Sequence, residues 1–189
     1  MEWNYTKPNE FKISNWSGGK TTELYIYPPS ADYAKRNFIF RLSCATVTDA
    51  KSTFSDLTSY NRKLMVLSDG LILQHDDCAP IKLKKYQVDT FDGSSKTVSY
   101  GKCNDFNVMW SKKSHIAPVI DICDNEYLNV ELKNPLKESF YYIISGTLFF
   151  CFDDKKVQLT EGGILHIEPS ETSFHFQAHQ KVQMIKVVI

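Results

Sequence analysis

The residues best suited to recognising a small molecule lie in the first 110 positions of this 189-residue chain. The stretch 16–23 combines an indole, two adjacent glycines, hydroxyl groups and a carboxylate, directly before an apolar segment. Glycines allow a close approach of the backbone, and their N–H groups can hold an anion. We therefore predict ligand contacts from this stretch, by Trp16, Gly18, Gly19, Thr21 and Glu23. The alternative is a glycine turn that only lets Trp16 pack.

The same letters G-G-K-T-T partly match a phosphate-binding loop. That motif needs a further glycine where this chain has Ser14, and it needs a helix after the lysine. An apolar strand pattern follows here instead, so the sequence does not predict a nucleotide site.

Two arginines are candidates for binding a carboxylate. Arg41 and Ser43 alternate with Phe40 and Leu42, and Arg62 begins another apolar segment. A guanidinium matches a carboxylate with two parallel hydrogen bonds, so two arginines beside one cavity favour an anionic ligand. The alternative is that both arginines make exposed or structural ion pairs.

Alternation also puts Asp105, Asn107 and Met109 on one face of a strand, with Phe106 and Val108 on the other. An acid, an amide and a thioether in a row are poor core filling but suit the wall of a semi-polar pocket. The alternative is an outward-facing polar surface.

The elements that must position these side chains are mainly β-strands. Alternation of apolar and polar residues dominates, as in 38–45, and short turns separate the segments. A helix is expected only at 30–36, as one or two turns capped by Ser30 or Asp32. Many short strands with regular turns predict an all-β, closed or sandwiched antiparallel fold.

Two turns contain glycine between apolar strands. Ser68-Asp69-Gly70 and Ser145-Gly146-Thr147 each predict a tight β-hairpin, because glycine supplies positive φ angles. The repeated pattern at 64–73 and 140–152 is consistent with two related barrels.

The C-terminal half has the outline of a cupin without the metal ligands. Gly163 and Pro169 have the spacing of the second cupin motif, but Phe174 stands where metal-binding cupins have histidine. His175 is one residue late, and such a slip turns a side chain to the opposite face. No histidine occurs in 131–139, where the first motif needs two. The sequence therefore predicts no metal and no cofactor.

Composition narrows the function classes. Lys and Arg number 22, as do Asp and Glu, and the pI near 6.9 does not favour binding to nucleic acid. The first residues lack a signal-peptide core, and no apolar stretch is long enough to span a membrane. Five widely spaced cysteines predict reduced thiols and a cytoplasmic protein.

Together the motifs resemble the HutD/Ves family. The matching stretches are 16–24, 40–47, 54–55, 62–67, 91–93 and 105–109, in the same order as in that family. One departure is that Trp16-Ser17-Gly18-Gly19 is shorter than the W-x-N-G-G-G type of loop found in many members. The loop closing over a ligand is therefore expected to differ in detail.

The resemblance implies a bicupin of the jelly-roll (RmlC-like) type, with an N-terminal barrel at about 1–112 and a C-terminal one at about 113–189, between which strands can be exchanged. It also implies a link to histidine utilisation, with urocanate or formylglutamate as a candidate ligand. Our first hypothesis is a ligand-binding regulator or sensor; a metal-free enzyme with Glu23 or Asp105 as base, and a dimeric interaction protein, are the alternatives. The predicted ligand-binding residues are Trp16, Gly18, Gly19, Thr21, Glu23, Arg41, Ser43, Arg62, Asp105, Asn107 and Met109.

Overall fold

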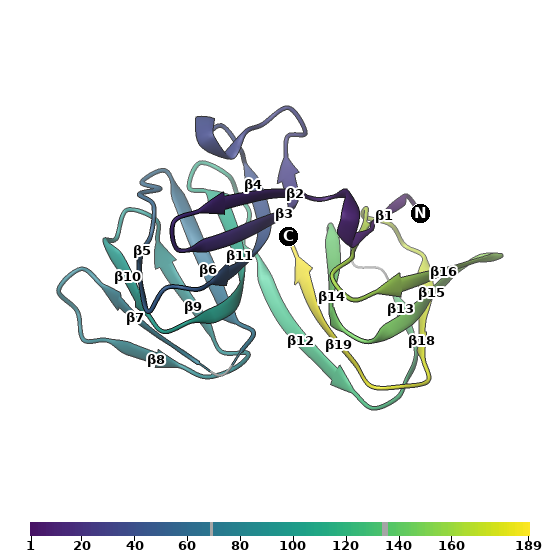
Figure 1. Cartoon of the computed structure of the whole chain (residues 1–189). Coiled ribbons are helices and arrows are strands. Elements are labelled where there is room, and N and C mark those ends of the chain that lie inside the picture. Colours follow the sequence, from purple (N-terminus) through teal and green to yellow (C-terminus); the bar gives the residue numbers. More distant parts are fainter. Residues whose placement is uncertain (69, 134–135) are drawn as a thin grey trace. The chain divides into compact units, whose positions relative to one another are not determined.

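The computed structural model describes residues 1–68, 70–133 and 136–189, which form two compact units (Figure 1). We call Lys12–Ile116 the N-terminal barrel. The C-terminal barrel combines Ala117–Ile189 with Met1–Phe11. Helical structure in the described residues is limited to two short 3₁₀ turns, so the predicted all-β fold class is confirmed.

The N-terminal barrel consists of two antiparallel sheets. The larger has the order β2-β3-β4-β11-β6-β9 and the smaller the order β5-β10-β7-β8. The elements are β2 (Lys12–Trp16), β3 (Gly19–Tyr27), η2 (Tyr33–Lys35), β4 (Phe40–Val47), β5 (Lys51–Thr53), β6 (Tyr60–Val66), β7 (Leu71–His75), β8 (Ile81–Leu83), β9 (Val88–Asp92), β10 (Thr97–Tyr100) and β11 (Cys103–Ser111).

The C-terminal barrel also has two antiparallel sheets, ordered β1-β17-β14-β19-β12 and β13-β18-β15-β16. Its elements are β1 (Trp3–Thr6), η1 (Pro8–Glu10), β12 (Val119–Asn125), β13 (Leu128–Lys133), β14 (Ser139–Ser145), β15 (Thr147–Phe152), β16 (Lys155–Thr160), β17 (Ile164–Ile167), β18 (Ser173–Ala178) and β19 (Val182–Val188).

The two barrels repeat one topology. The order β4-β11-β6-β9 in the first corresponds to β12-β19-β14-β17 in the second, and β5-β10-β7-β8 corresponds to β13-β18-β15-β16. The N-terminal barrel adds β2 and β3 beside β4, and the C-terminal barrel adds β1 beside β17. The internal similarity of the two halves is therefore a duplication of the whole strand order.

The two predicted hairpins are wrong. Strand β6 pairs with β11 and β9, whereas β7 belongs to the other sheet; β14 and β15 are likewise in different sheets. The glycine turns carry the chain from one sheet to the other. Gly146 has φ of 86°, and a Cβ there would lie 2.4 Å from the Lys181 carbonyl oxygen, so the corner requires glycine. Asp69 of the first turn lies outside the described residues.

The segment at 30–36 forms its helical turn as expected. Asp32 is the N-cap of η2, and its Oδ1 accepts a hydrogen bond of 2.7 Å from the Ala34 N–H. The turn ends at Arg36 in the left-handed conformation. This short element lies between β3 and β4 and places Tyr33 beside the inner face of the larger sheet.

The two barrel interiors differ in chemistry. The C-terminal barrel is filled by apolar residues, among them Tyr141, Phe150, Phe174 and Phe176, whose rings pack edge-on or tilted. Phe174 is 2% exposed, whereas His175 has the opposite orientation and contacts Asn129. The interior of the N-terminal barrel instead contains buried charged and amide groups, which are suited to binding a polar ligand.

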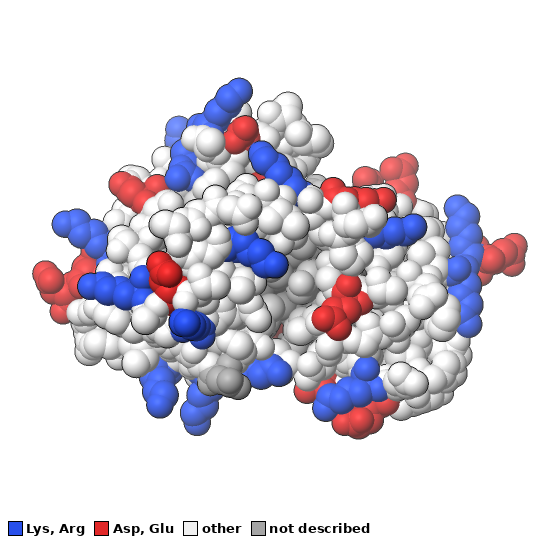
Figure 2. Space-filling view, viewed as in Figure 1, with Lys and Arg blue, Asp and Glu red and all other residues white. Residues whose placement is uncertain are grey.

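The expected division into 1–112 and 113–189 differs from the observed units at the N-terminus. Strand β1 pairs with β17, and Trp3 packs on Phe150, so the first 11 residues belong to the C-terminal barrel. No helix in the described part of the chain is long and apolar enough to cross a membrane. Basic and acidic side chains are interspersed on the face shown in Figure 2.

Candidate functional site

A cavity of about 350 Å³ lies within the N-terminal barrel, against the inner face of the larger sheet. Its lining is both polar and apolar. The lining residues are Lys12, Ser14, Asn15, Trp16, Thr21, Glu23, Asp32, Tyr33, Ala34, Arg41, Ser43, Ala45, Val47, Ser52, Thr53, Phe54, Ser55, Arg62, Asp105, Asn107 and Met109. Nine of the eleven predicted residues are included; Gly18 and Gly19 are not.

Strand register explains why residues distant in sequence meet here. Met109 on β11 pairs with Arg41 on β4 and with Arg62 on β6, which sets the two arginines on either side of Met109. Asn107 pairs with Ser43, which pairs in turn with Glu23 of β3. Since paired residues point to one face of a sheet, these side chains all enter the barrel.

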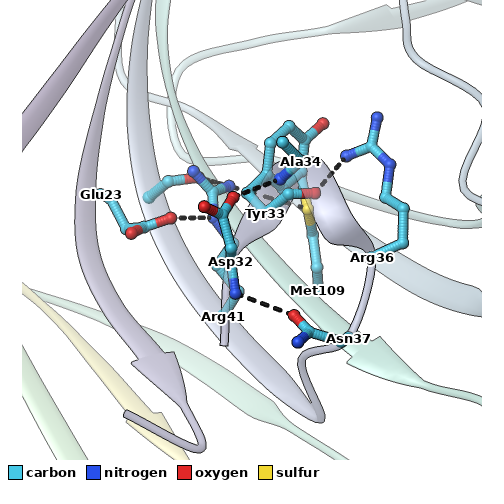
Figure 3. Close-up of polar contacts among 9 residues, drawn as sticks. Glu23, Asp32, Tyr33, Ala34, Arg36, Asn37, Arg41 and Met109 are labelled. Atoms are coloured by element: carbon cyan, nitrogen blue, oxygen red, sulfur yellow. Dashed lines mark hydrogen bonds and ion pairs between the residues drawn. The ribbon is translucent and has the colours of Figure 1, made fainter. Parts of the chain in front are cut away.

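Arg41 is already neutralised by the protein (Figure 3). Its Nε donates to Glu23 Oε2 at 2.8 Å, and its Nη1 donates to Ser43 Oγ at 2.9 Å. The guanidinium carbon lies 4.3 Å from the centre of the Tyr33 ring, which places the cation over the ring face. The sequence predicts that both arginines bind a ligand carboxylate. In the structure the ion pair with Glu23 leaves Arg41 far less available for that role.

Arg62 has a different environment. Its Nη2 donates to Asn107 Oδ1 at 3.1 Å, and its guanidinium carbon lies 4.7 and 5.1 Å from the ring centres of Phe54 and Phe91. The buried Nε–H has no hydrogen-bond partner among the described residues. Arg62 is only 6% exposed, and an unsatisfied buried donor is costly. Arg62 is thus a buried cation with a free donor at the cavity.

Asp105 is linked to Arg62 through an amide. Asn107 Nδ2 donates to Asp105 Oδ1, while Asn107 Oδ1 accepts from Arg62. Burial raises the pKa of Asp105 to about 7, although the Arg62 charge and hydrogen bonds from Asn107 and Cys103 act in the opposite direction. Burial likewise lowers the pKa of Arg62 to about 10, at which it stays protonated near neutrality. Arg62 is therefore a cation that stays charged, and Asp105 is a carboxyl whose pKa is raised into the neutral range.

Gly18 and Gly19 do not line the cavity but allow close packing of the β2–β3 turn beside it. Trp16 and Gly19 pair across the β2–β3 turn, and Trp16 Nε1 donates to Thr21 Oγ1 at 3.2 Å. A Cβ on Gly18 would lie 2.3 Å from the Trp16 ring, and one on Gly19 would lie 1.9 Å from the Thr46 carbonyl oxygen. These glycines permit close packing of the turn, which was the alternative interpretation of this stretch.

Sequence reasoning missed three aromatic residues that shape the site. Tyr33 lies between the guanidinium groups of Arg41 and Arg36, whose carbon atoms are 4.3 and 4.1 Å from its ring centre. Phe54 lines the cavity, and Phe91 supports Arg62 from β9. Both phenylalanines stand in stretches that carry the family resemblance, but apolar residues there give no sign that they contact an arginine.

Burial raises the pKa of Tyr33, but the charge of Arg36 and hydrogen bonds with Arg36 and Ser55 outweigh it and leave the pKa below its ordinary value.

Within residues 1–68, 70–133 and 136–189, no three His, Cys, Asp or Glu side chains gather closely enough to hold a metal ion. His75 contacts Asp89 at 2.7 Å and Thr97 at 2.8 Å, in an arrangement that joins the two sheets of the N-terminal barrel.

Comparisons with known proteins show the family and the fold of the chain. The HutD family model matches residues 8–185. Among curated proteins, none matches the chain in sequence. The conserved protein of unknown function PA5104 from Pseudomonas aeruginosa PAO1 is similar in structure, with a TM-score of 0.84, 20% identity, and coverage of 100% of this chain and 98% of that one.

HutD from Pseudomonas fluorescens SBW25 is similar at a TM-score of 0.72, with 17% identity and 98% of both chains covered. Oxalate decarboxylase from Lactobacillus farciminis, solved as a formate complex, gives a TM-score of 0.64 with 8% identity, over 97% of this chain and 85% of that one. These likenesses identify the fold as a bicupin. Since the family model covers nearly the whole length, the chain belongs to the HutD family, as the sequence motifs predicted.

Proposed function

We propose that this protein binds a small carboxylate in the cavity of the N-terminal barrel, with Arg62 as the residue that holds the carboxylate. The observation that carries the proposal is the state of Arg62: a guanidinium 6% exposed, next to a neutral amide, with its Nε–H unpaired among the described residues. A bound carboxylate supplies the missing acceptor and the direct ion-pair partner that Arg62 lacks among the described residues.

The rest of the cavity suits an organic anion of metabolite size. About 350 Å³ is within the range of small-molecule sites, and Trp16, Phe54 and Met109 supply apolar walls. Ser43 and Thr21 offer hydroxyl groups, although Ser43 already accepts from Arg41. Urocanate and formylglutamate remain our candidates, through the link to histidine utilisation implied by the family. The physiological role we propose is that of a sensor or regulator responding to such a metabolite.

The test is a thermal-shift and calorimetric titration with urocanate, formylglutamate and histidine. A ligand that binds only the folded state stabilises it by about 2.7 kcal/mol at 100 times its dissociation constant, which is readily detected. Arg62→Gln removes the cation but keeps a polar side chain, and we expect affinity to fall at least about 30-fold, since truncating a buried charge pair costs about 2 kcal/mol or more.

The matched control is Arg36→Gln, because Arg36 is likewise an arginine held over an aromatic ring, that of Tyr33, but it does not line the cavity. We expect it to change affinity by less than about threefold. Equal binding by the wild type and Arg62→Gln contradicts the assignment of Arg62.

One observation supports a second candidate, a metal-free enzyme. A carboxyl whose pKa is raised to about 7, as burial does for Asp105, suits general acid–base catalysis at neutral pH. Glu23 is less suited to that role because its Oε2 is engaged by Arg41. Turnover of urocanate or formylglutamate that disappears in Asp105→Asn supports this candidate, whereas binding without turnover supports the sensor.

A further inference from the structure

The cavity contains basic and acidic groups in equal number, which raises the question of how it accepts an additional anion. Three basic residues line it, Lys12, Arg41 and Arg62, and three acidic ones, Glu23, Asp32 and Asp105. With all six ionised the net charge is zero. Of these, Arg41, Arg62 and Asp105 are buried and Lys12 is exposed. An anion entering this neutral set of charges meets no excess positive charge to offset it.

Only one of the acidic groups is placed to change this balance. Glu23 is fixed by its ion pair with Arg41, and Asp32 caps η2 with its Oδ1. Asp105 has no basic partner in direct contact among the described residues; the Arg62 guanidinium reaches it through the Asn107 amide. Protonation of Asp105 therefore breaks no ion pair and leaves the cavity with one net positive charge.

We propose that the site takes up one carboxylate anion together with one proton, and that Asp105 is the group that accepts the proton. This inference rests on the proposed carboxylate binding at Arg62. The proton comes from solvent and adds to Oδ2, because Oδ1 accepts from the Asn107 amide whereas Oδ2 accepts only from the weak thiol donor Cys103 among the described residues. The carboxylate remains ionised on Arg62, so the bound state is equivalent to the neutral acid.

The surroundings of Asp105 support this coupling from every neighbouring strand. On β4 and β6 its register partners are Ala45 and Val66, which are uncharged. On β11 itself Cys103 Sγ lies 3.8 Å from Oδ2, and its own pKa is raised to about 12 by burial and by Asp105, so it stays a thiol.

The only cation acting strongly on Asp105 among the described residues is Arg62. A carboxylate bound to Arg62 cancels that attraction and adds a like charge, and both effects favour the protonated form of Asp105. Tyr33 and Arg41 border the same cavity, but Arg41 is balanced by Glu23. The amide of Asn107 thus connects ligand charge to proton uptake.

The experiment is isothermal calorimetry on the whole protein in phosphate and Tris buffers, whose ionisation enthalpies differ. The probe is 3-(2-furyl)acrylate, which has the size and carboxylate of urocanate but no ionisable ring; urocanate and formylglutamate are run beside it. With a free Asp105 pKa of about 7, uptake is expected to be about 0.9 proton per ligand at pH 8, about 0.5 at pH 7 and near zero at pH 5.5. Affinity should fall about tenfold per pH unit above pH 8.

The variant Asp105→Asn keeps an acceptor for Asn107 and should bind with no proton uptake at any pH. Asp49→Asn, at an exposed position of the same barrel, should behave as the wild type. Binding by the wild type at pH 8 without proton uptake overturns the coupling while leaving carboxylate binding intact. An absence of binding by all three acids overturns the proposed function, and the coupling with it.

Discussion

Replacing Asp105 by Asn should stabilise the protein at alkaline pH and change its stability little below about pH 4. Asp105 is 2% exposed, and burial raises its pKa from 3.8 to about 7. The folded state therefore holds this proton more tightly than the unfolded state does. The stabilising contribution of protonated Asp105 is complete below about pH 4 and is lost as the pH rises through 7.

The size of the effect follows from the shift. A difference of about three pKa units corresponds to about 4 kcal/mol of unfolding free energy between pH 4 and pH 8. An amide resembles the protonated acid, since it is neutral and offers both a donor and an acceptor. We expect Asp105→Asn to exceed the wild type by about 4 kcal/mol at pH 8 and by about 2 kcal/mol at pH 5, because the unfolded-state carboxyl already ionises above about pH 4.

The assay is equilibrium unfolding in urea from pH 5 to pH 8.5, followed by tryptophan fluorescence, with Asp49→Asn as the exposed control. The quantity of interest is the difference in unfolding free energy between the variant and the wild type at each pH. The contributions of all other titrating groups are common to both proteins and cancel in this difference. A variant that is less stable than the wild type at pH 8, or a difference that does not change with pH, refutes the account of a buried carboxyl held near neutrality.

Two further predictions concern packing and thiol chemistry. Gly19→Ala places a Cβ 1.9 Å from a backbone oxygen and should lower the free energy of unfolding by about 3 kcal/mol or more. The control Gly101→Ala is also at positive φ, but its Cβ would have its nearest neighbour at 3.8 Å, so it should cost only about 1–2 kcal/mol. Equal costs for the two variants would contradict the steric explanation. In a titration with a thiol reagent, exposed Cys78 should react first and buried Cys103, whose pKa is raised to about 12, only on unfolding. The fast phase should disappear in Cys78→Ser, and peptide mapping that finds Cys103 modified in the folded protein would count against its burial.

Much of the fold was predictable because alternation reports directly on strand faces. The period of two predicts that Arg41 shares a strand face with Ser43 and that Asp105 shares one with Asn107, whereas the fold decides that these faces point inward. The cap of η2 was predictable for a similarly local reason, since Asp32 satisfies a backbone N–H two residues later.

Strand pairing was not predictable from the same local rules. A glycine turn indicates that the chain changes direction but does not specify the strand with which the next segment pairs. In both barrels the decisive interactions are between strands distant in sequence, as β14 with β19 and β6 with β11. We predicted that the strands on either side of each glycine turn pair with each other, but the turn connects strands of different sheets. A glycine with positive φ fits either kind of turn, so it does not distinguish them.

The residues that line the site were largely predictable, but the hydrogen bonds and ion pairs between them were not. Glu23 lies 18 residues from Arg41, and Arg62 lies 45 residues from Asn107, so neither contact is visible in a sequence pattern. The different states of the two arginines, one neutralised and one without a carboxylate partner, arise only from the fold. Tyr33 and Phe54 could not be assigned for the same reason, because loops bring them to the cavity.

The most direct test of the central claim is a crystal structure of the protein with urocanate or formylglutamate at saturating concentration. We predict a carboxylate within hydrogen-bond distance of the Arg62 guanidinium, at about 2.7–3.0 Å, with the Arg41–Glu23 pair retained. A ligand bound elsewhere, or a carboxylate held by Arg41 after loss of its pair with Glu23, would contradict it.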